Sequence, residues 1–119
     1  MKRSIVRTAT CVAVGAALLA PGSAQAATKL TATVGPGFTI TLKNAAGKKV
    51  TRVKAGAYTI VVVDRATNHN FHLSGLGVNK RTGLAFKGRQ TWNVRLRKGT
   101  YRYVCDPHAF NMKGSFRVV

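Results

Sequence analysis

Acidic side chains are almost absent from this sequence of 119 residues. It contains no Glu, and its only carboxylate side chains belong to Asp64 and Asp106. Enzyme mechanisms in which paired carboxylates act as general acid and general base are therefore excluded. A Gly-rich phosphate-binding motif is missing as well. Together these absences argue against an enzyme.

The apolar periodicity of helices is also missing from the sequence, whose patterns predict short strands instead. Alternating apolar and polar residues, or runs of β-branched residues, predict strands at 30–34, 38–42, 50–53, 58–64, 71–73, 92–96, 101–105 and 115–119. Residues 74–90 contain four glycines and are expected to form a long irregular excursion. Seven or eight short strands at this spacing predict an antiparallel sandwich or barrel with Greek-key connections.

The alternation also predicts which way the side chains point. Cys105 follows Tyr103 by two residues, so both face the interior. His69 shares a face with Phe71 and is expected to point inward, whereas His72 is expected to point outward as a surface histidine.

The N-terminal segment has the features of a secretory signal peptide. Lys2, Arg3 and Arg7 give it a positive start, residues 11–20 form an apolar run too short to span a bilayer, and the segment ends in Ala-Gln-Ala. An uncleaved membrane anchor is the alternative interpretation.

We expect a signal peptide over residues 1–26 and one mature domain over residues 27–119. A domain of that size can fold alone. We expect it to be monomeric, to lack a transmembrane segment, and to be periplasmic, bound to the cell surface or secreted.

Basic residues dominate the charge. The chain has 20 Lys and Arg, and its formal net charge is +18 at pH 7. Such a charge concerns partners and solubility rather than fold, and it is compatible with nucleic acid, an anionic cell surface or an acidic protein. The basic residues are scattered along the sequence, which favours a uniformly solvated basic surface.

Sulfur is scarce beyond the signal peptide, and what remains is clustered. From residue 27 on, the only Cys is Cys105 and the only Met is Met112, with His108 between them. A lone thiol in an exported protein is a liability unless it is buried or bound to a metal. Thiolate, imidazole and thioether form a soft ligand set that suits copper. With His69 added, two His and one Cys with a weak axial Met match the blue-copper geometry.

Simpler interpretations exist for each residue alone. Cys105 could be a buried core thiol, His69 a structural histidine and Met112 a core residue. A zinc site is disfavoured because zinc does not use Met. A Cys–His nucleophile is disfavoured because its general base normally comes from elsewhere in the fold. The joint pattern favours copper over these alternatives.

The same segments resemble a known family. His-Asn at 69–70, YRYVCDPH at 101–108, Met112 and GSF at 114–116 are similar to the cupredoxins, the blue type 1 copper proteins of the plastocyanin, pseudoazurin and azurin type. The resemblance covers about residues 28–119. It implies an eight-stranded Greek-key sandwich with one copper ion near one end.

The resemblance also implies roles for individual residues. His69, Cys105, His108 and Met112 would be the copper ligands. Asn70 would brace the ligand loops, with its backbone N–H bonded to the Cys sulfur. His108 would face solvent as the electron port, inside an apolar patch that includes Pro107, Ala109 and Phe110.

The predicted function is that of a one-electron carrier between redox partners, not an enzyme. An extracytoplasmic copper chaperone or storage protein with the same ligands is the alternative. A basic module that binds nucleic acid or another polyanion is disfavoured by the export signal. The positive charge favours an acidic redox partner.

Overall fold

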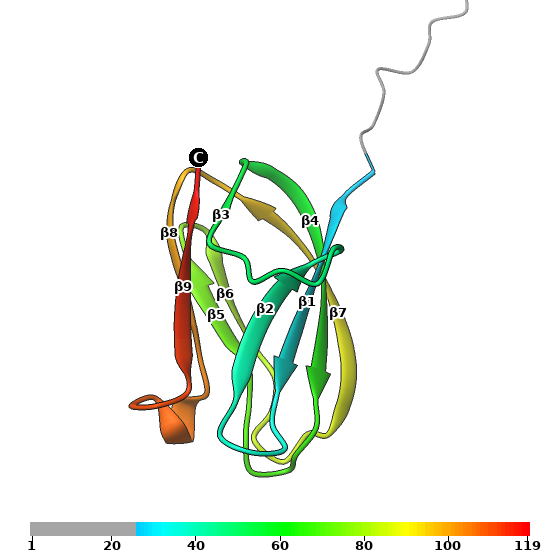
Figure 1. The fold of residues 1–119 in the computed structure, drawn as a ribbon, viewed down its shortest axis with the longest axis vertical. Helices are drawn as coiled ribbons and strands as arrows, with labels where there is room; N and C mark the ends of the chain where they lie inside the picture. Colours follow the sequence, from blue (N-terminus) through cyan, green and yellow to red (C-terminus); the bar gives the residue numbers. More distant parts are fainter. Residues whose placement is uncertain (1–25) are drawn as a thin grey trace, which may run out of the picture.

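Nine strands and one short 3₁₀ turn make up residues 26–119, which are the residues described by the computed structural model (Figure 1). The predicted signal peptide therefore lies outside the described residues except for Ala26. In chain order the elements are β1 (Thr28–Val34), β2 (Ile40–Asn44), β3 (Arg52–Val53), β4 (Gly56–Asp64), β5 (His72–Gly75), β6 (Val78–Arg81), β7 (Gly88–Leu96), β8 (Gly99–Val104), η1 (Asp106–His108) and β9 (Lys113–Val118).

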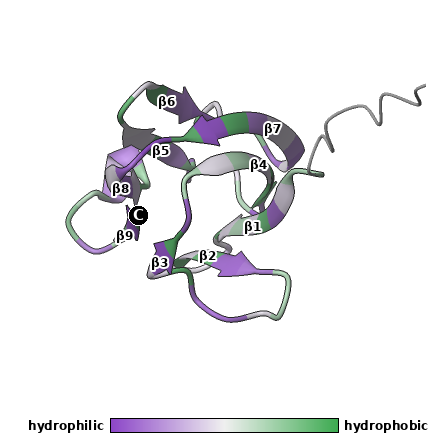
Figure 2. Cartoon of the chain, turned by 90° about the horizontal axis from the view of Figure 1, so that it is seen from above, coloured by the Kyte–Doolittle hydropathy of each residue, from purple (hydrophilic) through white to green (hydrophobic). Residues whose placement is uncertain are grey.

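The strands form two sheets that face each other across one core (Figure 2). One sheet has the order β2-β1-β4-β7 and the other the order β3-β9-β8-β5-β6. This confirms the predicted β-sandwich. Two neighbouring pairs, β1–β4 and β3–β9, run parallel, so the sheets are mixed rather than purely antiparallel. The parallel pairs arise because the chain crosses between the sheets, which brings strands that are distant in sequence side by side.

Period-2 alternation decides which side chains enter the core. In β1, Leu30, Ala32 and Val34 are buried, while the threonines between them are half-exposed. The same pattern holds in β4, β7 and β8. Residues at i and i+2 share a face of a strand, so this pattern places one side of each sheet against the other.

Aromatic rings fill the core next to β8. The rings of Phe71 and Tyr103 are stacked with centroids 5.5 Å apart, and those of Tyr101 and Phe116 with centroids 5.4 Å apart. A Cβ atom at Gly114 would overlap the Tyr103 ring. This glycine is needed because a ring lies directly against the backbone.

The prediction that residues 74–90 form an irregular excursion is wrong in part. This segment contains the edge strand β6, and β7 begins at Gly88 rather than at residue 92. Only Val78 is buried in β6, so the segment carries no alternation that a sequence pattern could detect. Phe38 was also predicted to be in a strand, but β2 begins at Ile40 and Phe38 is 62% exposed.

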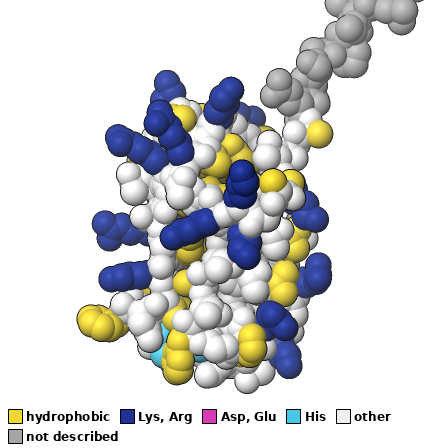
Figure 3. Space-filling model, in the orientation of Figure 1, with side chains coloured by type: hydrophobic (Ala, Val, Ile, Leu, Met, Phe, Trp, Pro, Cys, Tyr) yellow, Lys and Arg dark blue, Asp and Glu magenta, His cyan; other side chains and the backbone are white. Residues whose placement is uncertain are grey.

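In Figure 3, Lys and Arg side chains are spread over this face, and the histidine side chains that are visible lie at its lower end beside apolar ones. Within residues 26–119, no helix is long and apolar enough to cross a membrane.

Candidate metal centre

Three of the four predicted ligands lie on or beside the loop that joins β8 to β9. Cys105 immediately follows β8, His108 ends η1, and Met112 precedes β9. The Cys105 N–H donates to the Met112 carbonyl (3.0 Å), and the Met112 N–H donates to the His108 carbonyl (2.9 Å). Pro107 is exposed at the start of η1, where its fixed φ suits the turn and its missing N–H costs nothing. The loop is therefore tied at both ends.

His69 reaches the same place from the other side of the fold, just before β5. Its Nδ1 lies 3.1 Å from Nδ1 of His108. The Cys105 Sγ lies 3.6 Å from Nδ1 of His69 and 3.6 Å from Nδ1 of His108. These three residues form a group whose ligand atoms all lie within 4.8 Å of one another.

The triangle of donor atoms has the right size for a transition-metal ion. With sides of 3.1, 3.6 and 3.6 Å, the point equidistant from the three atoms lies about 2.0 Å from each. Bonds from such ions to imidazole nitrogen are about 2.0–2.1 Å and bonds to thiolate sulfur about 2.3 Å. The residues present therefore fit a metal ion held by two imidazoles and one thiolate.

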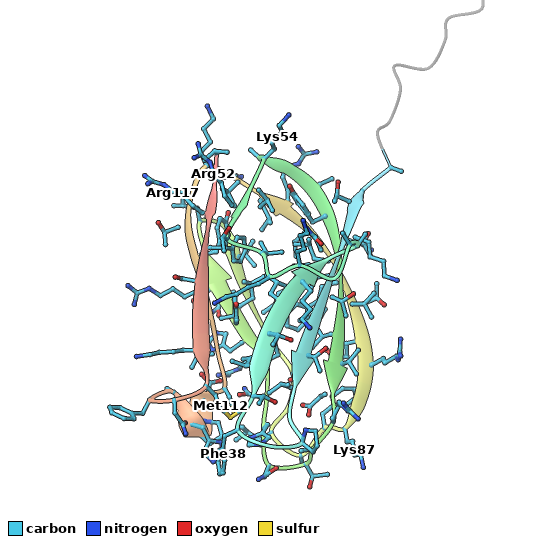
Figure 4. All side chains as sticks on the ribbon, viewed as in Figure 1. Phe38, Arg52, Lys54, Lys87, Met112 and Arg117 are labelled. Atoms are coloured by element: carbon cyan, nitrogen blue, oxygen red, sulfur yellow. The ribbon has the colours of Figure 1, made fainter. Side chains whose placement is uncertain are left out.

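Burial differs among the four predicted ligands. Cys105 and Met112 are fully buried and His69 is 1% exposed, whereas His108 is half-buried and reaches the surface. Met112 lies at the same end of the sandwich as Phe38, the end that holds the ligand loop (Figure 4).

Comparison with known proteins shows which proteins this chain resembles. The chain is 42% identical over 66 residues to amicyanin-alpha from Methylorubrum extorquens, a match that covers 53% of this chain and 55% of that protein. The chain therefore spans about half the length of the curated relative it matches. No protein-family model matches the sequence.

Solved structures agree on the fold. An amicyanin mutant in its Cu(I) form matches with a TM-score of 0.51 and 22% identity, over 77% of this chain and 83% of that one. Rusticyanin from Thiobacillus ferrooxidans matches with a TM-score of 0.56 and 22% identity, over 76% of each chain. These matches show the fold of this chain, and together with the similarity to amicyanin-alpha they agree with the resemblance to cupredoxins. This confirms the resemblance on which the sequence interpretation depended.

Asn70 connects the ligand loop to the neighbouring strands. Its backbone N–H donates to the Cys105 Sγ (3.4 Å). Its side-chain oxygen accepts the Asp106 N–H (2.7 Å), and its amide nitrogen donates to the Asp106 carboxylate (2.7 Å) and the Thr82 carbonyl (3.4 Å). Asn70 is 1% exposed, so these bonds are shielded from water.

His72 and Asp106 extend this network to the surface. The two His72 ring nitrogens face the Asp106 Oδ1 (2.9 Å) and the Asn79 Oδ1 (2.6 Å). Partial burial would lower the pKa of His72, but the hydrogen bonds to Asp106 and Asn79 raise it above its usual value. Burial would raise the pKa of Asp106, but hydrogen bonds from Asn70 and His72 lower it. His72 is thus a surface histidine, as predicted, and its tie to the ligand loop was not foreseen.

Phe38 is a residue at the site that the sequence analysis missed. Its ring contacts both imidazoles edge-on, with centroids 5.7 Å from His69 and 5.0 Å from His108. The Gly-Pro-Gly segment at 35–37 was the available signal, because it ends β1 and turns the chain back over the site. Gly35 itself lies against the His69 ring: the Cδ2 atom of His69 is 3.0 Å from the position that a Cβ of residue 35 would take.

The second carboxylate, Asp64, is buried at the end of β4. One oxygen accepts the Ala66 N–H (3.1 Å), while the other, Oδ2, is buried and has no hydrogen-bond partner among the described residues. Burial raises the pKa of Asp64, and the Ala66 N–H, His69 and Thr82 oppose that rise. The charged Asp64 carboxylate therefore lowers the stability of the folded protein.

Replacing Asp64 by Asn should raise the free energy of unfolding at neutral pH by about 1 kcal/mol, since a neutral amide costs less to bury than an unpaired carboxylate oxygen. Because the folded-state pKa is raised, Asp64 stabilises the fold below its unfolded-state pKa, and that contribution is lost as pH rises through the folded-state value. Urea unfolding at several pH values should show the advantage of the variant growing with pH. An advantage that shrinks as pH rises would contradict this account.

Proposed function

We propose that this chain is an exported type 1 copper protein that carries one electron at a time between redox partners. The observation that supports it is the convergence of two imidazole nitrogens and one thiol sulfur on a single point. Copper, when bound there, supplies a one-electron couple between Cu(II) and Cu(I). The similarity to amicyanin-alpha and the soft donor set favour copper over zinc.

The chain's own residues would have distinct roles in holding the ion. The Cys105 thiolate and the imidazoles of His69 and His108 would supply three donors, and Met112 a weak fourth. Metal binding requires a deprotonated thiol and neutral imidazoles. Burial of Cys105 and His69 keeps water away from two of these donors.

Rigidity is what suits this loop to electron transfer. The backbone bonds among Cys105, His108 and Met112 and the Asn70 side chain hold the donors in one arrangement. A scaffold that does not move between the two oxidation states keeps the reorganisation accompanying transfer small. The half-buried His108 would be the port through which electrons leave.

The donor set also supports a carrier rather than an enzyme. With three donors from His69, Cys105 and His108 and a weak fourth from Met112, the ion would have no open position for a substrate. Asp106 is held by Asn70 and His72, so it is not free to act as a general base.

A titration with Cu(II) tests this proposal against the alternative of a copper chaperone or storage protein. An electron carrier should turn intensely blue with one equivalent of Cu(II) and should show reversible voltammetry. A colourless protein that binds only Cu(I) and passes it to an acceptor would favour the chaperone instead.

Met112 provides a prediction about the reduction potential. The weak axial ligand of a blue-copper site tunes its potential. Met112→Gln should lower the potential, because an oxygen donor favours Cu(II), and Met112→Leu should raise it, because a donor is lost. We expect shifts on the order of tens of millivolts in voltammetry. Unchanged potentials in both variants would exclude Met112 as a donor.

We also propose that the redox partner is acidic. The positive field of the protein would speed encounter with an anionic partner. Second-order transfer to an anionic oxidant should slow by about tenfold between low salt and about 0.2 M salt. Transfer to a cationic oxidant should speed up over the same range. Rates that do not depend on salt for either oxidant would exclude steering by charge.

A further inference from the structure

The carboxylate side chains do little to balance the basic surface. Asp64 is 2% exposed, and the Asp106 carboxylate is engaged by Asn70 and His72. Basic side chains on the surface of the described residues are thus unpaired with carboxylate side chains. They are therefore available to an anionic partner, and their placement determines where it would bind.

One cluster lies at the end of the sandwich farthest from the ligands. Figure 4 shows Arg52, Lys54 and Arg117 at one end, and Met112 and Phe38 at the other. We call this end the basic pole and define it by its exposed cations and one leucine: Arg52, Lys54, Leu76, Arg97, Lys98 and Arg117.

Strand pairing holds the cations of the basic pole together. Arg52 and Arg117 are register partners on β3 and β9. They line one groove together with Lys98 and Thr100. The backbone carboxyl end of the described chain, at Val119, is also at this end, and the cations outnumber it (Figure 1).

An apolar side chain projects among these cations. Leu76, in the β5–β6 turn, is 56% exposed, and its Cδ1 lies 2.9 Å from where a Cβ of Gly99 would be. The Tyr101 hydroxyl fixes the turn, since it donates to the Leu76 carbonyl (2.9 Å) and accepts the Arg97 N–H (2.9 Å). The Arg97 guanidinium lies about 4 Å from where a Cβ of Gly77 would be, next to Leu76. Leu76 is thus presented to solvent at a fixed place among cations.

We propose that the basic pole binds an anionic phospholipid surface, with Leu76 inserted among the head groups. Lys and Arg are attracted to such a surface, and an apolar side chain beside them adds affinity by entering the boundary of the acyl chains. A soluble phosphate polymer would use the cations but would gain nothing from Leu76. Docked in this way, the protein would present His108 away from the lipid. Only this last point, the orientation, depends on the proposed electron-carrier function.

Co-sedimentation with vesicles tests the proposal, using the protein as it is exported by an expression host. Vesicles of phosphatidylcholine with about one third phosphatidylglycerol should bind it, and vesicles of phosphatidylcholine alone should not. Arg52→Gln with Arg117→Gln should weaken binding by roughly 25-fold, at about fivefold for each cation. Leu76→Gln should weaken it by about fivefold to tenfold.

Two control variants make the outcome decisive. Lys87→Gln with Arg89→Gln removes the same amount of charge near the ligand end. The two residues flank Gly88, which pairs with Asp64. This variant should weaken binding by less than about fivefold. Cys105→Ser should bind lipid as the wild type does, so that a failure of copper binding and a failure of lipid binding are told apart. Thermal melts establish that each variant is folded.

Three results would overturn the proposal. The first is the absence of binding to the anionic vesicles. The second is an equal loss in the two paired-charge variants, which would indicate net charge alone. The third is an unchanged affinity of Leu76→Gln with full competition by soluble polyphosphate, which would indicate a phosphate polymer instead of a lipid surface.

Discussion

Cys105→Ser should abolish the intense blue absorption of the Cu(II)-loaded protein completely. That absorption requires a thiolate bonded to the ion, and Cys105 is the only Cys among residues 27–119. Its Sγ is also the atom that lies 3.6 Å from both imidazoles. A serine oxygen is a harder donor, so any Cu(II) that still binds should be pale. Visible absorption with one equivalent of Cu(II) measures the effect.

A loss of colour must be distinguished from a loss of fold. Cys105 is fully buried, and a buried hydroxyl costs about 1–2 kcal/mol, which this sandwich should tolerate. Far-ultraviolet circular dichroism should therefore be unchanged. His72→Gln is the matched control, because His72 contacts Asp106 and Asn79 rather than the three clustered donors. It should remain blue, and a blue Cys105→Ser protein would exclude the proposed site.

Asn70→Ala should lower the free energy of unfolding by about 3 kcal/mol. The change removes three side-chain hydrogen bonds at once and leaves the Asp106 N–H, the Asp106 carboxylate and the Thr82 carbonyl without those partners. The Thr82 carbonyl is buried and would pay the desolvation cost of losing its partner, and the two bonds to Asp106 are part-buried, one of them to a charged group. Urea unfolding of the two proteins at neutral pH measures the difference.

Asn79→Ala is the matched control for this prediction. Asn79 is an exposed asparagine whose side chain bonds His72 at the outer end of the same network. Its loss should cost less than about 1 kcal/mol, because water replaces an exposed partner. If both variants lost the same small amount of stability, Asn70 would not be the residue that fastens the ligand loop. The Asn70 variant should also show a shifted visible band, since its loop is released.

The alternation of apolar and polar residues was sufficient to predict which faces of the regular strands are buried. The inward sides of β1, β4, β7 and β8 follow from period-2 alternation, because a strand has only two faces and one of them must be buried. The edge strand β6 could not be predicted in this way, because it buries only Val78. Its position comes from backbone pairing with β5, which leaves no trace in the hydrophobic pattern.

The site shows the same division. Cys105, His108 and Met112 could be proposed from their spacing, because donors on one short loop can reach one ion. For the contact of Phe38 with both imidazoles, the sequence offered only the Gly-Pro-Gly turn after β1, which indicates a chain reversal but not that Phe38 reaches His108. The tie from His72 to Asp106 likewise joins residues that are far apart in the chain.

Residue types and neighbours a few positions away specify the kinds of donor atoms, the number of basic residues and the strand pattern, so these could be read from the sequence. The contact between His69 and Cys105, and the position of Leu76 beside the cations of the basic pole, follow only from the folded arrangement. These contacts depend on how the two sheets pack against each other and on which strands pair. Such long-range contacts are set by the packing of the whole core rather than by any single segment.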